Sequence, residues 1–218
     1  MLFAIDDRDI ERYVEENMSH LPGDELLDEI ERYTFWNTVN PRMISGKIQA
    51  RLLQYFVMMN GAEKVLEIGT FTGYSAVAMA NVLPEGGVVV SFDVNDEYAE
   101  KARTLLSGKA VEKKIKIYTS GFDNVLESYG KFDLIFVDGE KDEYMAYFEK
   151  YFPYLTSSGI MIFDNVLWSK KIFDANAKDK KTVHLLKFNE EMKKKAEVIN
   201  FILPVRDGLM LVMKNNFD

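Results

Sequence analysis

Two apolar stretches of this chain each end abruptly in residues with oxygen-bearing side chains. Residues 132–137 lead into Asp138, and residues 159–163 lead into Asp164 and Asn165. Apolar runs rich in β-branched and aromatic residues are typical of buried parallel strands, whose carboxyl ends meet at one edge of a sheet. If these strands are neighbours, about 5 Å apart, the two carboxylates repel each other unless a cation lies between them. The pattern therefore predicts a metal site built from oxygen ligands alone.

This ligand set favours a hard divalent cation. Two carboxylates and an amide oxygen suit Mg²⁺, Mn²⁺ or Ca²⁺ rather than zinc or copper. Three protein oxygens leave coordination positions for an acceptor with two vicinal hydroxyls, and a phenol bound to a cation loses its proton more readily. The competing interpretation is helix capping, because Asp and Asn are common at strand-to-helix turns. Capping explains any one of the three residues better than all of them together.

Lys141 follows Asp138 by three residues and is a candidate proton acceptor at the same site. A lysine accepts a proton only in its neutral form, so this role requires a lowered pKa, which a nearby cation would provide. From the residues alone, the simpler interpretation is that Lys141 pairs with Glu140 or Asp142 in solvent.

A further group of residues predicts a pocket for a small ligand. The run from Glu67 to Ser75 contains Gly69 and Gly73 in a Gly-x-x-x-Gly spacing after an apolar stretch. Glycines there let the backbone turn tightly and approach a ligand. Because the spacing is not Gly-x-Gly-x-x-Gly, a small anion such as an amino-acid carboxylate suits the next helix better than a pyrophosphate. Asp93, after the second strand, stands where an acid binds ribose hydroxyls. Glycines at strand ends can also serve packing alone.

The elements that would position these residues alternate between strands and helices. The expected strands cover 65–68, 88–92, 115–118, 134–137 and 160–163, and the helices between them lie near 74–83, 97–106, 123–129 and 143–154. This alternation predicts an α/β protein with a mostly parallel sheet covered on both faces.

The two ends of the chain differ from this pattern. Residues 1–60 predict N-terminal helices that precede an α/β core over 61–218. A helix near 182–195 comes before the runs 198–203 and 209–213, which resemble an antiparallel pair. We expect a single domain over the whole chain.

Composition excludes several classes of protein. The chain has 218 residues, 47% hydrophobic and 28% charged residues, a net charge of −8 and no cysteine. Disulfides, thiolate zinc sites and a cysteine nucleophile are therefore excluded, and the acidic balance disfavours nucleic acid as a partner. Neither a signal peptide nor an apolar run of about 20 residues is present, so we expect no membrane segment and a cytoplasmic location.

The ordered motifs resemble a known family. Residues 65–75 closely resemble motif I of class I S-adenosylmethionine-dependent methyltransferases. From about Pro41 to the end, the chain resembles the cation-dependent O-methyltransferases typified by caffeoyl-CoA and catechol O-methyltransferases. The motifs that support this follow one another in family order at 43–45, 65–75, 92–93, 137–141, 163–168, 188–189 and 203–208. The resemblance implies a doubly wound, Rossmann-like fold with seven strands, the last antiparallel, and a homodimer.

The resemblance also assigns roles to individual residues. The implied S-adenosylmethionine ligands are Met43, Ser45, Glu67, Gly69, Phe71, Ser75, Asp93, Gly121, Phe122, Asp123 and Asp138. Asp138, Asp164 and Asn165 would bind the divalent cation, and Lys141 matches the lysine that acts as general base in the catechol enzymes. The acceptor would be a small molecule with vicinal hydroxyls, methylated on one oxygen.

The substrate side is less well defined by the motifs. Trp168 could form a wall for an aromatic acceptor or simply pack, and Asn189 could assist there or lie on a helix surface. Arg206 departs from the family, in which glycine is common before Asp-Gly; it contacts an anionic substrate or only decorates a turn. The segment 169–171 also departs from the family pattern.

Two other functions fit parts of the pattern. A tRNA wobble-uridine methyltransferase would use the same fold but needs a basic surface for phosphates, which the acidic balance disfavours. A non-catalytic cofactor-binding module is disfavoured by the complete ligand set with Lys141.

Overall fold

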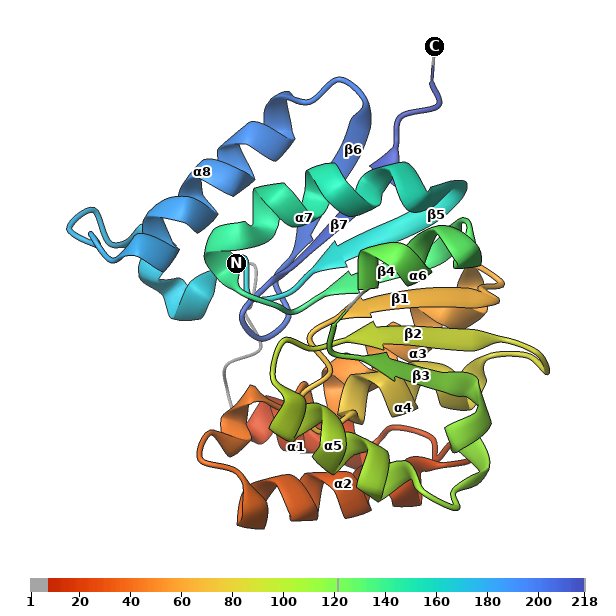
Figure 1. The fold of residues 1–218 in the computed structure, drawn as a ribbon. Coiled ribbons are helices and arrows are strands. Elements are labelled where there is room, and N and C mark those ends of the chain that lie inside the picture. The colour runs from red at the N-terminus through yellow and green to blue at the C-terminus, as the bar shows by residue number, and fades with distance from the viewer. Residues whose placement is uncertain (1–7, 121, 218) are drawn as a thin grey trace.

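Seven strands form one sheet in the order β3-β2-β1-β4-β5-β7-β6. The computed structural model describes residues 8–120 and 122–217. The strands are β1 (Lys64–Ile68), β2 (Val88–Phe92), β3 (Ile115–Tyr118), β4 (Phe132–Val137), β5 (Leu155–Phe163), β6 (Val198–Leu203) and β7 (Leu209–Lys214). Neighbouring strands are parallel except where β7 pairs with β5 and β6. The predicted mostly parallel sheet with an antiparallel last strand is confirmed (Figure 1).

Helices cover both faces of this sheet because its central strands are apolar on both sides. Val65 and Phe136 belong to the core on one face, and Leu66 and Ile135 to the core on the other. The first face carries α2 (Asp24–Asn37), α3 (Gly46–Met59), α4 (Tyr74–Val82) and α5 (Asp96–Leu106). The second carries α6 (Phe122–Tyr129), α7 (Tyr144–Tyr151) and α8 (Lys180–Lys194), seen above the sheet in Figure 1.

The remaining helices are short. A first helix, α1 (Arg8–Glu16), precedes α2, and 3-10 turns cover Pro41–Met43, Ala110–Lys114, Lys141–Glu143, Phe152–Tyr154 and Trp168–Phe173. Across the described ranges, every helix is too short or too polar to cross a membrane.

The strands β1 and β4 begin one and two residues earlier than the sequence predicts, and β5 begins five residues earlier. We expected the strand at 160–163, whereas β5 starts at Leu155, which pairs with Phe132 before a register shift in β4. The polar residues 156–158 interrupt the apolar run and are only partly buried or exposed. They hide the first half of the strand from a pattern based on hydrophobicity.

Candidate active site

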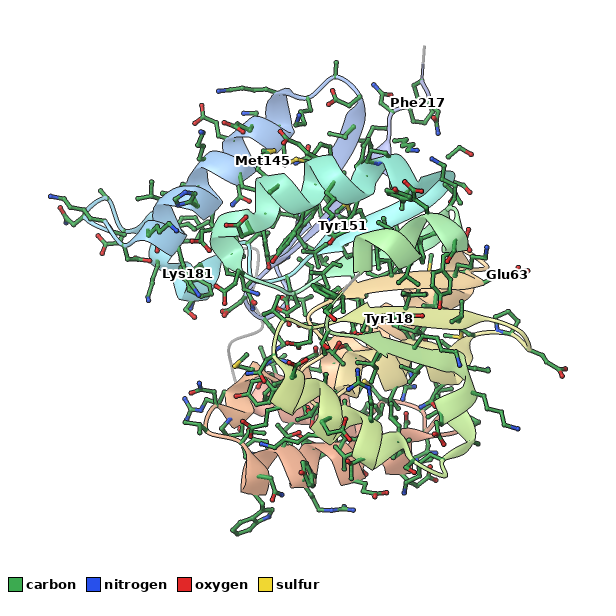
Figure 2. The ribbon with its side chains drawn as sticks, in the orientation of Figure 1. Glu63, Tyr118, Met145, Tyr151, Lys181 and Phe217 are labelled. Carbon is green, nitrogen blue, oxygen red and sulfur yellow. The ribbon has the colours of Figure 1, made fainter. Side chains whose placement is uncertain are left out.

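A large cavity lies at the carboxyl-terminal edge of the sheet, where the chain connections diverge between β1 and β4. Open α/β sheets bind ligands at this position. Its volume of about 940 Å³ is large enough for a nucleoside-sized cofactor together with a small acceptor. Figure 2 shows Lys181, one of the lining residues, near this edge and Glu63 near the opposite edge.

Most residues predicted to form the site line this cavity. They are Met43, Ser45, Gly69, Phe71, Asp93, Asp138, Lys141, Asp164, Asn165, Trp168 and Arg206. Glu67, Ser75 and Asn189 are not part of the lining. Gly121 lies outside the described residues, and Phe122 and Asp123 begin α6 with side chains that the structure does not describe.

Gly69 brings the loop after β1 against the end of β4. Its φ is +107°, and a Cβ atom at this position would lie 2.5 Å from the backbone oxygen of Asp138. A residue with a side chain would force the two segments apart, so only glycine permits this approach. Two predicted parts of the site, the glycine loop and the acid after β4, are therefore in direct backbone contact.

Glu67 is fully buried behind the glycine loop. Its Oε2 accepts a 2.5 Å hydrogen bond from Ser91 Oγ, and the Ser91 and Thr70 hydroxyls lie 2.6 Å apart. Burial raises the pKa of Glu67 to about 8, although hydrogen bonds from Ser75 and Ser91 favour the charged form. Its Oε1 has no partner among the described residues. This atom is enclosed by the protein and lies outside the cavity lining.

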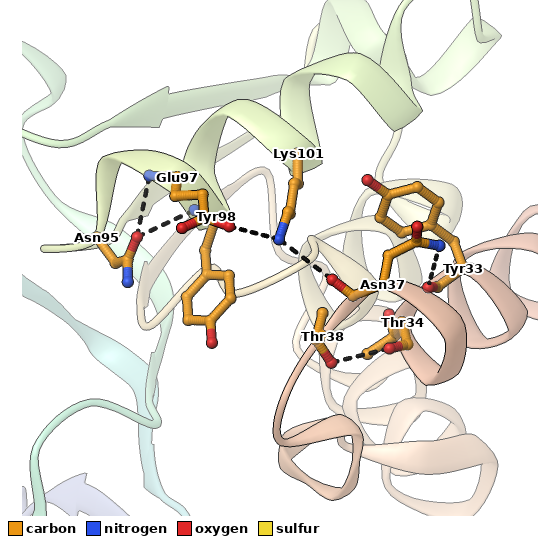
Figure 3. A network of polar contacts seen from close by, with 8 residues as sticks. All are labelled: Tyr33, Thr34, Asn37, Thr38, Asn95, Glu97, Tyr98 and Lys101. Atoms are coloured by element: carbon orange, nitrogen blue, oxygen red, sulfur yellow. Dashed lines mark hydrogen bonds and ion pairs between the residues drawn. The ribbon is translucent and has the colours of Figure 1, made fainter.

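Asp93 fixes the loop from the side of β2. Its Oδ2 accepts a hydrogen bond from the backbone N–H of Phe71 at 2.7 Å, and its Oδ1 accepts one from Asn95 at 2.8 Å. Each carboxylate oxygen keeps a lone pair for a ligand hydroxyl. The Asn95 side chain in turn caps α5 by accepting from the N–H groups of Glu97 and Tyr98 (Figure 3).

Tyr98 is a cavity residue that the sequence interpretation missed. Its ring packs edge-on against Phe71, with 4.7 Å between centroids. On the same helix, Lys101 Nζ binds Glu97 at 2.7 Å and the backbone oxygen of Asn37 at 3.2 Å, which joins α5 to the end of α2 (Figure 3). The signal available in the sequence for Tyr98 was an aromatic residue in the first turn of the helix that follows Asp93.

Asp138 and Asp164 follow positions that are paired in the sheet. Val137 of β4 pairs with Phe163 of β5, so the next residue of each strand is an aspartate. The backbone N–H of Asp164 also donates to Val137 O at 3.0 Å, which keeps the two segments adjacent. Burial, and then the charge of Asp138, raises the pKa of Asp164. Two neighbouring acids at a buried strand edge create the electrostatic cost that the sequence predicted.

Lys141 is buried against these acids rather than in solvent. It is 8% exposed, and its Nζ lies 2.5 Å from Asp138 Oδ1. Glu140 and Asp142, its alternative partners, bind Lys181 and Lys180 instead. Burial opposes the ammonium charge, but the neighbouring acids, Asp138 first, raise the pKa of Lys141 above its ordinary value. In this arrangement Lys141 is protonated, whereas the proton-acceptor role requires a lowered pKa.

Asp164 is held by three groups, two of which come from other elements. Gln49 Nε2, on α3, donates to its Oδ2 at 2.7 Å. The Asn165 N–H donates to its Oδ1 at 2.6 Å, and Tyr144 Oη, on α7, donates to its backbone oxygen at 2.7 Å. Gln49 and Tyr144 were missed by the sequence interpretation. For Gln49, the one signal in the sequence was a glutamine among the apolar residues of α3.

The loop after β5 forms another wall of the cavity. Trp168, Ser169 and Lys170 have φ values of +47°, +49° and +65°, a conformation that residues with a Cβ atom rarely adopt. Asp207 holds this loop, since its carboxylate accepts from the Ser169 N–H at 3.2 Å and its backbone oxygen from the Leu167 N–H at 2.7 Å. The departure from the family pattern at 169–171 therefore coincides with an unusual backbone.

Asn189 supports the same loop from behind. Its Nδ2 donates to Val166 O at 3.0 Å, from a position outside the cavity lining. Trp168 lines the cavity, but its buried Nε1–H and the Asn189 Oδ1 have no partner among the described residues.

The donor set suits a hard cation. The described residues contain no group of three or more His, Cys, Asp or Glu placed to bind a metal ion. The candidate ligands are instead two carboxylates and the amide of Asn165, which line the same cavity. The half-buried Asp138 and the buried Asp164, balanced by the ammonium group of Lys141, fit a cation-binding role chemically.

The fold and the pocket define a class I S-adenosylmethionine-dependent methyltransferase. A sequence profile described as O-methyltransferase matches residues 16–215, and the chain belongs to this family. Catechol O-methyltransferase domain-containing protein 1 of Mus musculus is 33% identical over 172 residues, 76% of this chain. The chain spans just under two thirds, 66%, of that relative. Probable caffeoyl-CoA O-methyltransferase 2 of Dictyostelium discoideum is 27% identical over 89% of this chain and 88% of its own length.

Solved structures agree with this assignment. An O-methyltransferase from Bacillus cereus in complex with SAH superimposes with a TM-score of 0.84 and 25% identity, over 95% of this chain and 97% of that one. The SAH-bound methyltransferase PaMTH1 of Podospora anserina has the same fold, with a TM-score of 0.86 and 22% identity over 99% of each chain. The relatives support an S-adenosylmethionine-dependent O-methyltransferase of the caffeoyl-CoA type and favour neither the tRNA enzyme nor the non-catalytic module.

Proposed function

We propose that this protein is a divalent-metal-dependent O-methyltransferase that methylates one hydroxyl of a small acceptor with two vicinal hydroxyls. The observation that carries the proposal is the juxtaposition of Asp138 and Asp164 at paired strand ends, with Lys141 Nζ 2.5 Å from Asp138. These groups line the same cavity as the glycine loop and Asp93.

The cofactor would be held by the loop after β1 and by Asp93. Gly69 permits close backbone approach, Asp93 has free lone pairs for ribose hydroxyls, and Tyr98 and Phe71 provide aromatic surface. S-adenosylmethionine supplies an electrophilic methyl group on sulfur. The contribution of these residues is positioning, because a methyl transfer needs its reacting atoms aligned and close together.

The cation would be held by Asp138, Asp164 and Asn165. A hard cation such as Mg²⁺, Mn²⁺ or Ca²⁺ lowers the pKa of a hydroxyl that it binds. Asp164 is oriented for this role by Gln49 and by the Asn165 N–H, which both favour its charged form. Gln49 also lines the cavity and contributes to the site as a neutral hydrogen-bond donor.

Lys141 would accept the proton of the acceptor hydroxyl. It must first lose its own proton, which the carboxylate of Asp138 now stabilises. Engagement of Asp138 and Asp164 as ligands would remove that stabilisation, and burial would then favour the neutral amine, with the proton released to solvent. The proton affinity of Lys141 would therefore depend on whether a cation is bound by Asp138 and Asp164.

The test is methyl transfer from S-adenosylmethionine to three acceptors: a catechol, a hydroxycinnamoyl ester and unmodified tRNA. Each would be assayed with EDTA and with added Mg²⁺. We expect transfer to the small acceptors, abolished by EDTA and restored by Mg²⁺. Lys141→Met should abolish transfer while binding of S-adenosylhomocysteine, measured by calorimetry, is retained. The proposal fails if the protein binds no divalent metal and Asp164→Ala leaves transfer intact.

We further propose a cytoplasmic location and a homodimer. Both rest on the family resemblance and on composition rather than on contacts within the chain. Sedimentation velocity over a range of concentrations would measure the mass of the assembly, and a constant monomer mass would contradict the dimer.

A further inference from the structure

Arg206 occupies a turn in which the backbone favours glycine. It lies between β6 and β7 with φ +50°, a conformation that residues with a Cβ atom adopt at a cost. Such an outlier beside a cavity suggests that the side chain has a task beyond the turn itself.

The guanidinium group of Arg206 reaches a segment far away in the sequence. Its Nη1 and Nη2 both donate to the backbone oxygen of Ile44, at 3.3 Å each, across 162 positions of the chain. Both Ile44 and Ser45 are 6% exposed. The contact therefore joins the β6–β7 turn to the interior side of the segment 41–46.

Gly46 makes room for this contact. Its φ is +75°, and a Cβ atom there would lie 2.7 Å from Arg206 Nη1. The start of α3 is thus shaped around the guanidinium group, and the two positions fit each other as a pair.

The segment that Arg206 holds is part of the cofactor cavity. Met43, Ile44 and Ser45 line it, as does Arg206. The next residue of the turn, Asp207, holds the opposite loop through Ser169 and Leu167. One turn consequently fixes two walls of the same cavity, the N-terminal wall through the side chain of Arg206.

We propose that Arg206 is a positioning residue that fastens the segment 41–46 over the cofactor and slows cofactor release. The proposal deepens the cofactor-binding part of the proposed function and depends on neither the metal nor the acceptor. Because the guanidinium group binds a backbone oxygen, its contribution is carried by its donors and not by the identity of the side chain at 44.

The experiment compares S-adenosylhomocysteine binding to the wild type and to Arg206→Gly, Arg206→Met and Arg206→Lys, without metal or acceptor. Charge-assisted hydrogen bonds of this kind correspond to roughly a tenfold change in affinity. We expect Arg206→Gly and Arg206→Met to raise both the dissociation constant and the dissociation rate by about tenfold. Arg206→Lys, which keeps one donor group, should recover part of the loss.

Two further measurements distinguish loss of the contact between Arg206 and Ile44 from a general effect on folding. Arg206→Gly should melt no earlier than Arg206→Met, because glycine relieves the left-handed backbone, although both bind the ligand equally weakly. Trypsin should cleave after Arg42, which lies within the segment, and after Lys47, which follows it, faster in both variants than in the wild type.

Several outcomes would overturn the proposal. If S-adenosylhomocysteine binding is unchanged in Arg206→Gly and Arg206→Met, or is weaker in the glycine variant alone, the guanidinium group does not fasten the segment 41–46. An increased acceptor KM with unchanged S-adenosylhomocysteine binding would make Arg206 a substrate contact instead. A wild-type protein that binds no S-adenosylhomocysteine would count against the cofactor assignment itself, and Arg206 would have no cofactor to retain.

Discussion

At the scale of single residues, the site depends on how buried charges are partnered. Asp164 is 4% exposed and lies beside Asp138, so its charged form depends on the positive charge of Lys141 and on the hydrogen bonds that it accepts. One of these comes from Gln49, which is 1% exposed and belongs to a different layer of the molecule. A neutral donor from α3 therefore favours the charged form of an acid at the strand edge, which is the form that a cation would require.

We predict that Gln49→Met weakens binding of Mg²⁺ by about 10- to 100-fold, the usual effect of losing a group that orients a metal ligand. The substitution keeps the volume and removes the donor to Asp164. Isothermal titration of the apo protein with Mg²⁺ or Mn²⁺ would measure the change.

Gln54 offers a matched control for this experiment. It is on the same helix and also 1% exposed, but neither atom of its amide has a partner among the described residues. Gln54→Met should therefore leave cation binding unchanged. Equal losses in the two variants would indicate a general disturbance of α3 and would contradict a specific role for Gln49.

At the scale of elements, the N-terminal helices are part of the site rather than an appendage. Thr34 of α2 is fully buried, and its Oγ1 lies 2.8 Å from Thr72 Oγ1, in the loop between Gly69 and Gly73. The Thr34 hydroxyl also donates to Ile30 O at 2.7 Å. The glycine loop is thereby supported by α2 on one side and by Asp93 on the other.

We predict that Thr34→Val destabilises the fold by about 1–3 kcal/mol, because it leaves a buried hydroxyl without its partner. Chemical denaturation would measure this free energy of unfolding. In a double-mutant cycle, Thr34→Val with Thr72→Val should cost less than the sum of the single changes.

Thr38→Val is the comparison for this prediction. Its hydroxyl donates to the backbone oxygen of Thr34 on the same helix, as Figure 3 shows, but it is only partly buried. Water can replace that partner, so the loss should be smaller. Additive effects of the Thr34 and Thr72 substitutions would show that the two hydroxyls do not support each other.

Much of the architecture at this scale could be predicted from the sequence. The strands at 88–92, 115–118 and 198–203 have the expected bounds, because their apolar runs are sharply delimited. The early start of β5 could not be predicted, because residues 156–158 are polar and their pairing with β4 depends on a register shift. Backbone features such as the positive φ values at 168–170 were equally hidden, because Trp, Ser and Lys give no local signal for that conformation.

At the scale of the whole molecule, burial of ionisable groups near the sheet edge makes the free energy of unfolding depend on pH. Glu67 has a pKa raised to about 8 by burial, compared with an ordinary value of 4.5. The folded protein therefore holds a proton that the unfolded chain releases between these pH values. This contribution to stability is complete below the lower value and is lost as the pH rises through the upper one.

We predict that the free energy of unfolding of the apo protein falls as the pH rises from about 5 to about 8, by up to about 1.4 kcal/mol per pH unit from Glu67. Glu67→Gln should reduce this slope, and Asp164, whose pKa is also raised, should maintain a residual one. Denaturation at several pH values would measure it. The control is Glu63→Gln, an exposed position just before the same strand; an identical slope in wild type and Glu67→Gln would contradict the assignment.

The sequence by itself determined which acidic side chains follow the strands. Each apolar run fixes a buried strand, and the acid that follows must emerge at the sheet edge, so Asp93, Asp138 and Asp164 could be placed from local pattern alone. Only the tertiary structure decided how these groups are partnered. Gln49 reaches Asp164 across 115 positions and Arg206 reaches Ile44 across 162. Contacts over such distances depend on how helices and turns pack together, which no local spacing of residues encodes.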